Sequence, residues 1–227
     1  MSNLPSPAKD KIWIASFDPG SVNFSFCIEE LNLKQLEKVK SLKLKRNSSE
    51  NEEKIYNKNL DLIHGCSKVV IVKNTNLTLG CDKNKYVDLK VFYNITDYLD
   101  QYKIYFDNCS YIVVEQQMSF GKKKNTLAVK IAQHIISYFI LNYGSFKRIY
   151  EYPSYNKTQV LNAPKGMDKP KRKKWAIEKA LSILESRGDL ETHSHISKSK
   201  KKDDLSDTIV MTESFIYSEL VLGKLIK

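Results

Sequence analysis

The sequence predicts an α/β protein in which helices cover a mixed β-sheet in a three-layer arrangement. Two apolar runs near the beginning of the chain have the length and residue types of strands, with turn residues between them. Further strand-like runs follow, and segments with apolar residues at helical spacing lie between and after them. Strands that are interleaved with helices in this order are typical of three-layer α/β folds.

The first two strands are predicted at residues 11–18 and 22–29. KIWIASFD is a continuous apolar run that stops at Pro19 and Gly20, which together are a turn signal. In the SVNFSFCIEE that follows, apolar and polar residues alternate with a period of two, as in a half-buried strand. We expect these two strands to pair with each other.

The region that follows carries weaker signals. An alternation of apolar and polar residues predicts a third strand within residues 33–45. Polar residues dominate 46–60 and predict a loop or an insertion. KVVIVKN at 68–74 predicts another strand, and residues 75–87 are expected to be irregular.

Helical and strand-like segments alternate in the second half of the chain. Apolar residues recur at helical spacing within residues 88–109, and YIVVEQQ at 111–117 predicts a central strand. Residues 125–144 predict a long helix that ends at a glycine, and KRIYEYP at 147–153 predicts the last strand.

The last third of the chain is rich in lysine. PKGMDKPKRKK at 164–174 is expected to be a basic loop that leads into a helix over 174–188. A polar link is expected at 191–201. The final helix is predicted over 203–225, where apolar residues are spaced for one buried face.

The charge of the chain favours a polyanionic partner. The 227 residues include 37 lysines and arginines against 26 acidic residues, which gives a formal net charge of +11. Nucleic acid or an anionic membrane surface would suit this balance. No apolar run approaches the roughly 20 residues of a membrane span, so we expect no membrane insertion. The cysteines are scattered without a CxxC pair, which disfavours zinc.

Acidic residues stand where two predicted strands end and where the last helix begins. Asp18 ends the first strand, and Glu115 lies near the end of a later one. Asp204 and Asp207 are three residues apart and share one face of the last helix, while Asp203, four residues before Asp207, is the competing choice. The carboxyl ends of parallel strands meet at one edge of an α/β sheet, so we expect these acids to converge there.

Each acidic residue also has an ordinary structural explanation. An aspartate before Pro-Gly is commonly a turn residue, a strand-end glutamate can face solvent, and aspartates at a helix start can be caps. The combination in a basic chain favours a metal site, because converging carboxylates repel one another unless a cation lies between them. Two Mg²⁺ ions about 4 Å apart could clamp the attacking and leaving oxygens of a phosphodiester.

Three motifs that carry these acids, SFDPGSVNFSF, YIVVEQQM and KKDDLSD, make the chain similar to a known family. It resembles the RuvC-like Holliday junction resolvases of the ribonuclease H-like superfamily, in the branch of poxviruses and other large DNA viruses that is related to fungal mitochondrial resolvases. The resemblance covers about residues 11 to 222 and is poorest across 45–87. It implies a ribonuclease H-like, mixed five-stranded sheet in a single domain over 11–227, with a tail at 1–10 and an insertion at 45–87.

The resemblance implies that Asp18, Glu115, Asp204 and Asp207 are the catalytic, metal-binding residues, with the participation of Asp203 left open. The implied activity is that of a crossover junction endodeoxyribonuclease, which uses two Mg²⁺ ions, or Mn²⁺ in their place. Such an enzyme resolves Holliday junctions and branched or concatemeric replication intermediates by paired symmetric nicks, as a homodimer. Without a targeting peptide, we expect it in the cytoplasm, at viral replication sites.

Basic residues next to these motifs are the candidate DNA contacts. Lysines and arginines that bind phosphates supply affinity without reading sequence, which suits recognition of a branched shape. Three aromatic residues flank the basic segments: Phe120, Tyr155 and Trp175. We expect them to pack in the core, and stacking on unpaired bases is the alternative. The candidate DNA-binding residues are Lys122, Lys123, Lys124, Lys157, Lys165, Lys169, Lys171, Arg172, Lys173, Lys174, Lys201 and Lys202.

Other functions remain open on the sequence. A nuclease of the same fold could act on flaps, RNA–DNA hybrids or transposon ends instead of junctions. The chain could also be a nucleic-acid-binding module without catalysis. An actin-like or sugar-kinase-like ATPase, with DPGSVN as a phosphate loop, is disfavoured because the chain has only eight glycines and no second copy of the fold.

Overall fold

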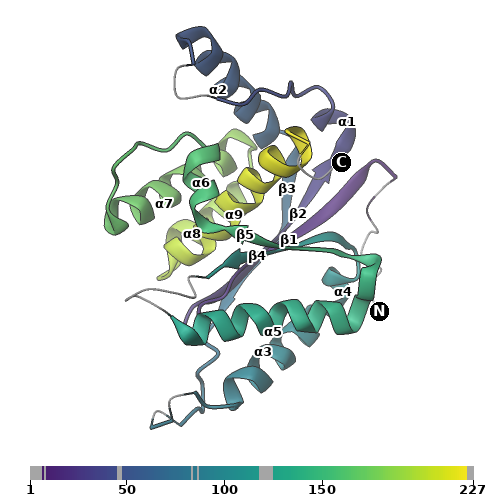
Figure 1. Cartoon of the computed structure of the whole chain (residues 1–227), viewed down its shortest axis with the longest axis vertical. Helices are drawn as coiled ribbons and strands as arrows, with labels where there is room; N and C mark the ends of the chain where they lie inside the picture. The colour runs from purple at the N-terminus through teal and green to yellow at the C-terminus, as the bar shows by residue number, and fades with distance from the viewer. Residues whose placement is uncertain are drawn as a thin grey trace.

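The computed structural model shows a central sheet with helices on both faces, which confirms the predicted three-layer α/β fold (Figure 1). The helices within residues 90–143 lie on one side of the sheet, and those within residues 50–64 and 154–215 lie on the other. The structure describes residues 7, 9–44, 48–82, 84–85, 87–117 and 125–223.

In the described part of the chain the sheet has five strands in the order β3-β2-β1-β4-β5. The antiparallel part comprises β1 (Lys11–Asp18), β2 (Phe24–Asn32) and β3 (Ser67–Thr75). The parallel part adds β4 (Cys109–Gln116) next to β1, and β5 (Arg148–Pro153) at the edge. The strands predicted at 11–18, 22–29, 68–74, 111–117 and 147–153 are therefore confirmed.

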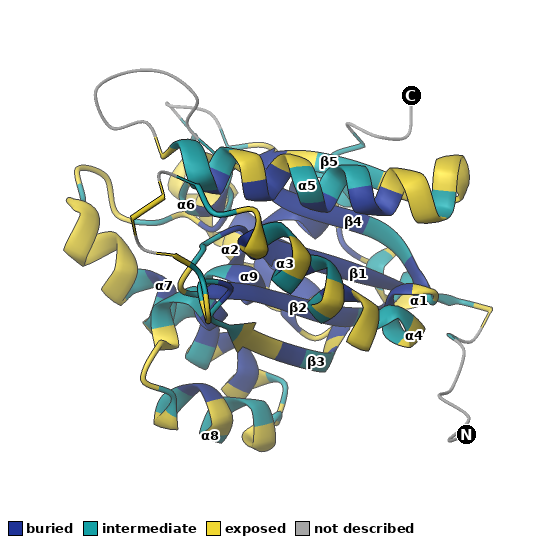
Figure 2. Ribbon diagram, turned by 90° about the horizontal axis from the view of Figure 1, so that it is seen from below, coloured by how far each residue is buried: buried dark blue, intermediate teal, exposed yellow. Residues whose placement is uncertain are grey.

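One face of the sheet packs against α3 (Lys90–Gln101), α4 (Lys103–Phe106) and α5 (Thr126–Tyr143). Phe17 lies in the middle of this layer, with its ring centroid 5.4–6.2 Å from four other phenylalanine rings. Figure 2 views the sheet from this side and shows the strands as largely buried. None of the described helices combines the length and the apolar character needed to cross a bilayer.

The opposite face of the sheet packs against α9 (Lys202–Phe215), which continues into a π-helical segment, η2 (Ile216–Val221). Every residue of α9 from Thr208 to Phe215 is buried, because the helix lies between the sheet and an outer layer. That outer layer comprises α6 (Ser154–Val160), α7 (Lys169–Ser186) and α8 (Leu190–Lys198).

Two predictions before β3 are wrong. Residues 33–45 were expected to be a strand, but they begin with a short helix, α1 (Leu33–Leu36), and then continue as irregular backbone up to residue 44. Residues 46–60 were expected to be a loop or an insertion, and the loop is wrong, because Ser49 and Glu52 form a reciprocal capping box that starts α2 (Glu50–His64). Tyr56, Leu60 and Ile63 are spaced along one face of this polar helix and are buried.

The basic loop and the polar link expected near the end of the chain are largely helical. Asp168 caps α7, and Pro170 occupies its first turn, where a missing N–H costs nothing, so the lysines from Lys169 onward lie on a helix. Asp189 caps α8 in the same way, and this helix occupies most of the link that was expected at 191–201. The helix predicted over 88–109 is divided into α3 and α4 at Tyr102.

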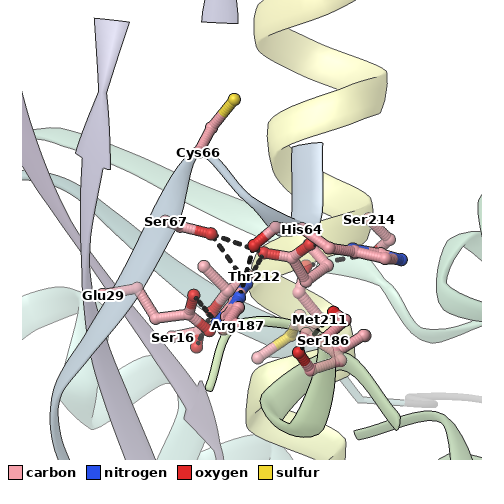
Figure 3. Close-up of polar contacts among 12 residues, drawn as sticks. Ser16, Glu29, His64, Cys66, Ser67, Ser186, Arg187, Met211, Thr212 and Ser214 are labelled. Carbon is pink, nitrogen blue, oxygen red and sulfur yellow. Dashed lines mark hydrogen bonds and ion pairs between the residues drawn. The ribbon is translucent and has the colours of Figure 1, made fainter. Parts of the chain in front are cut away.

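A buried charge cluster fastens α9 to the layers around it (Figure 3). The guanidinium of Arg187, which follows α7, donates to Glu29 Oε2 of β2 at 2.9 Å and also pairs with Glu213 of α9. His64 and Ser67 both contact Glu213, and Arg187 also donates to Ser67 Oγ at 2.7 Å. Segments far apart in the sequence therefore meet at Glu213.

The cluster holds two carboxylates against one permanent cation. Burial raises the pKa of Glu29 to about 7, and the attraction of Arg187 only partly offsets this effect. Burial acts in the same direction on Glu213, but there Arg187 and His64 outweigh it and lower the pKa to about 2. Glu29 is therefore the member of the cluster that gives up its charge more easily.

This raised pKa of Glu29 predicts a pH dependence of stability. The ordinary pKa of a glutamate is 4.5, so the folded protein binds this proton more tightly than the unfolded chain. The resulting stabilisation is complete below pH 4.5 and is lost as the pH rises to about 7. Relative to Glu29→Gln, the wild type should lose up to about 3 kcal/mol of unfolding free energy across this window, as measured by urea denaturation.

The control for this comparison is Glu53→Gln, at an exposed position of α2, which should run parallel to the wild type at every pH. Parallel curves for the wild type and Glu29→Gln would contradict the prediction.

Candidate active site

Asp18 and Glu115 lie at the ends of two neighbouring parallel strands. Phe17 of β1 pairs with Val114 of β4, and Asp18 and Glu115 are the next residues along these strands. Side chains alternate along a strand, and Phe17 and Val114 point into the layer of α3 and α5. Asp18 and Glu115 therefore face the opposite layer, where α9 lies, as the sequence predicts.

The first turn of α9 brings further carboxylates to the same edge. Ser25 of β2 donates a hydrogen bond of 2.9 Å from its Oγ to the main-chain carbonyl of Asp204. Ser25 is the cross-strand partner of Asp18, so this bond anchors the start of the helix opposite the end of β1. Asp207 lies one turn further along the helix.

A lysine ammonium lies between the acids. Lys157 Nζ is 2.9 Å from Glu115 Oε1 and 3.0 Å from Asp207 Oδ1, and Lys157 is only 7% exposed. The residue belongs to α6, the short helix that begins directly after β5. We expected Lys157 among the DNA contacts but not in ion pairs with Glu115 and Asp207, because these pairs join segments 42 and 50 residues apart in the chain.

Burial and the neighbouring negative charges disfavour the ionised form of three of these acids. The pKa of Asp18 is raised well above its usual range, first by burial and then by the negative charges of Glu115, Asp207 and Asp204. Burial and the neighbouring Asp203 raise the pKa of Asp204 to about 6. Burial also raises the pKa of Asp207, although the ammonium of Lys157 opposes the rise.

The ammonium of Lys157 responds to the same environment in the opposite sense. Burial alone would favour its neutral form, but the charges of Glu115, Asp207 and Asp18 outweigh burial and raise its pKa. Lys157 is therefore firmly protonated, and it supplies one positive charge to a group of four carboxylates.

Asp203 is set apart from this group. It forms an ion pair with Lys173 of α7, and this attraction outweighs burial and lowers its pKa. Asp204, in contrast, has a buried Oδ2 atom for which the described residues provide no hydrogen-bond partner. This buried oxygen of Asp204 could therefore bind a ligand.

The chemistry of these residues fits a hard divalent cation, but their present arrangement is built around Lys157. Among the described residues, no group of three or more histidine, cysteine, aspartate or glutamate side chains is arranged to hold a metal ion. Carboxylate oxygens are the donors that Mg²⁺ prefers, and the unpartnered oxygen of Asp204 is of this kind. The raised pKa values of Asp18, Asp204 and Asp207 indicate that the neighbouring lysines leave the acids short of positive charge.

Apart from Lys157, the candidate DNA-binding residues fall into three groups. Lys122, Lys123 and Lys124 lie outside the described residues, as does Phe120. Lys165 is exposed before α7, and Lys201 and Lys202 are exposed where α9 begins. The first turns of α7 carry the exposed residues Lys169, Lys171, Arg172, Lys173 and Lys174, and the ion pair of Lys173 with Asp203 brings this helix next to the acids. Tyr155 is 59% exposed, whereas Trp175 packs against the core.

Comparison with solved structures defines the class of fold. The chain resembles the Fowlpox virus resolvase, solved with its substrate Holliday junction DNA, with a TM-score of 0.51 and 16% identity, over 91% of this chain and 98% of that one. It also resembles the RuvC of Thermus thermophilus in complex with a Holliday junction substrate, with a TM-score of 0.52 and 12% identity, over 91% and 94% of the two chains. The protein has the fold of the RuvC-like resolvases.

Sequence comparison identifies the family. No family model matches the chain. "Uncharacterized protein 170L" of Invertebrate iridescent virus 6 is 33% identical over 229 residues, covering 91% of this chain and 89% of the relative. "Uncharacterized protein 97L" of Invertebrate iridescent virus 3 is 32% identical over 216 residues, covering 89% and 98%. The chain belongs to the same family as these iridescent virus proteins.

The central position of Lys157 predicts a large effect of its removal. Lys157→Met leaves Glu115 and Asp207 without their cation, so the free energy of unfolding in metal-free buffer should fall by about 3–5 kcal/mol. Urea denaturation with a chelator present measures this change. Lys200→Met, at an exposed position, should stay within about 0.5 kcal/mol of the wild type. A decrease below about 1 kcal/mol for Lys157→Met would show that the acids do not depend on this ammonium.

Proposed function

We propose that this protein is a divalent-metal-dependent endonuclease that cuts four-way DNA junctions, a crossover junction endodeoxyribonuclease. The observation that carries the proposal is the meeting of Asp18, Glu115, Asp204 and Asp207, from two strand ends and one helix, at a single edge of the sheet. Two proteins of similar fold, a viral resolvase and RuvC, were solved with Holliday junction DNA, and this supports the choice of substrate.

The four carboxylates would hold the metal ions, which are Mg²⁺ or, in their place, Mn²⁺. When bound, such ions supply an activated water and stabilise the departing oxygen of a phosphodiester. Asp18 and Glu115 are fixed by neighbouring strands, so their main chains cannot separate, while Asp204 and Asp207 move only as far as α9 moves. The two pairs of acids therefore form two sides of the same site, one on the sheet and one on the helix.

Lys157 has a separate role in this proposal. Its ammonium neutralises part of the charge of Glu115 and Asp207 and keeps the acids together. Two of its three N–H donors are used by these acids, so the third could bind an oxygen of a phosphate that approaches the same edge. The residue would thus support the acids in the absence of metal and contact the DNA backbone.

The basic start of α7 would guide DNA toward the acids, with Lys165, Lys201 and Lys202 extending the contact surface. A homodimer would match the approximate two-fold symmetry of a junction and would allow paired symmetric nicks. The proposal includes a single domain over 11–227 and activity on branched or concatemeric replication intermediates. Relatives from large DNA viruses support a role in viral DNA replication.

The experiment that tests the function compares Asp204→Asn with the wild type. On a synthetic four-way junction with Mg²⁺, the variant should bind normally, but its cleavage rate should fall at least about 100-fold, because it loses a charged metal ligand. Gel assays of binding and of single-turnover cleavage measure the two quantities separately. Cleavage by Asp204→Asn at the wild-type rate would remove this residue from the mechanism.

Asp203→Asn is the matched control, because Asp203 is adjacent in the chain but paired with Lys173. Its cleavage rate should stay within about fivefold of the wild type, since a partly exposed ion pair contributes at most about 1 kcal/mol. A panel of flap, RNA–DNA hybrid, transposon-end and plain duplex substrates distinguishes a junction enzyme from a related nuclease. A protein that binds all of these but cuts none would be a binding module.

The salt dependence of junction binding tests the role of α7. Replacing Lys171, Arg172 and Lys174 by glutamine should make the slope of log affinity against log salt shallower by about 0.9 for each phosphate that is no longer neutralised. The combined change should therefore approach about 3 in fluorescence anisotropy titrations with Ca²⁺ in place of Mg²⁺. The same substitution of Lys90, Lys103 and Lys130, on helices of the opposite layer, should leave the slope unchanged. Equal changes in both variants would show that net charge alone sets the affinity.

A further inference from the structure

We propose that Ser25 is a positioning residue that sets where Asp204 lies relative to Asp18. The inference rests on the proposed function, because it concerns the placement of two proposed metal ligands. Ser25 itself has no titratable group and contacts neither a metal nor DNA in the proposal. Its hydroxyl would act only through the main chain of α9.

The geometry links the two halves of the site through one hydrogen bond. Ser25 is completely buried, and its Oγ donates to the carbonyl oxygen of Asp204 at 2.9 Å. On the neighbouring strand, Ser25 is the direct partner of Asp18. Directly opposed residues of paired strands point to the same face, so Asp18 and the hydroxyl of Ser25 are presented to α9 side by side.

A second hydroxyl continues this attachment along the helix. Ser16 Oγ donates to the carbonyl of Thr208 at 3.0 Å and lies 2.6 Å from Thr212 Oγ1. Ser16 and Thr212 are seen beside the buried charge cluster in Figure 3. Serines of β1 and β2 therefore bind carbonyls of α9 one turn apart, and Ser25 makes the contact nearest to the proposed ligands.

Apolar packing alone would not fix the helix in this way. Leu205, Ile209 and Val210 bury α9 against its surroundings, but the hydrophobic effect has no direction and tolerates a small slide of the helix. The start of the helix also experiences repulsion, because Asp204 and Asp207 face the carboxylates of Asp18 and Glu115. A hydrogen bond from Ser25 to the first turn opposes the displacement that this repulsion favours.

The expected signature separates positioning from general stability. One hydrogen bond between neutral groups contributes little to folding, so Ser25→Ala should remain folded. A shift of a proposed ligand by about 1 Å, in contrast, can lower a reaction rate by up to about 100-fold. Ser206 provides a matched control on the same helix, since its Oγ is buried without a hydrogen-bond partner in the described residues.

The test compares the wild type, Ser25→Ala and Ser206→Ala in two measurements. With saturating junction and Mg²⁺, Ser25→Ala should cleave about tenfold more slowly, while its junction affinity stays within about twofold. In hydrogen–deuterium exchange without DNA or metal, peptides over residues 202–209 should exchange faster in Ser25→Ala. Ser206→Ala should match the wild type in both measurements.

The exchange measurement decides the proposal even if the wild type does not cut junctions. Unchanged exchange at 202–209 in Ser25→Ala would overturn it, whatever the substrate of the enzyme proves to be. Equal effects of Ser25→Ala and Ser206→Ala would also overturn it, because they would reflect the loss of buried volume. Faster exchange in Ser25→Ala alone, in a protein that cuts no junction, would support the positioning role and refute the proposed function.

Discussion

The structure depends on the electrostatic problem of placing several carboxylates at one edge of a sheet. Negative charge on one acid makes ionisation of the others less favourable, and burial adds to this effect. Without a compensating cation, the four carboxylates of Asp18, Glu115, Asp204 and Asp207 would repel one another. Lys157 supplies the nearest compensation, with an ammonium about 3 Å from two of the four acids. Lys173 and Lys201 act on Asp204 from a greater distance, but the pKa values of Asp18, Asp204 and Asp207 stay raised, and a site of this kind attracts further cations.

Helix α9 experiences this repulsion, because it carries two of the four acids, Asp204 and Asp207. Apolar residues bury it against the sheet, serines of β1 and β2 bind its carbonyls, and the Arg187 cluster holds its far end through Glu213. The polar contacts are directional, whereas the apolar ones are not. Together they explain how a helix that begins with repelling charges can keep a fixed position.

The sequence alone predicted the fold class and the five strands of the sheet, together with a strand at 33–45 that does not form. Apolar runs, period-two alternation and acids at strand ends are local signals, so they can be recognised without the fold. The prediction failed where the signal was not local. The helix α2 looked like a loop because its exposed face is polar and only the Ser49–Glu52 box marks its start. The place of Lys157 and the partners of Arg187 follow from contacts across 26 to 158 residues of chain, which no local pattern encodes.

The large sequence separation of the contacts made by α9 also affects how the protein folds. Ser16 contacts Thr208 and Thr212 across 192 and 196 residues of sequence. Strand β1 is synthesised early, so it can complete its contacts only after α9 has been synthesised. Contacts this distant in the chain slow folding, since a large loop must close before they form. During synthesis, Asp18 and Glu115 would emerge from the ribosome long before their partners. A chain interrupted before residue 202 would therefore carry only two of the four acids, on a sheet that still lacks the helix α9 on one of its faces.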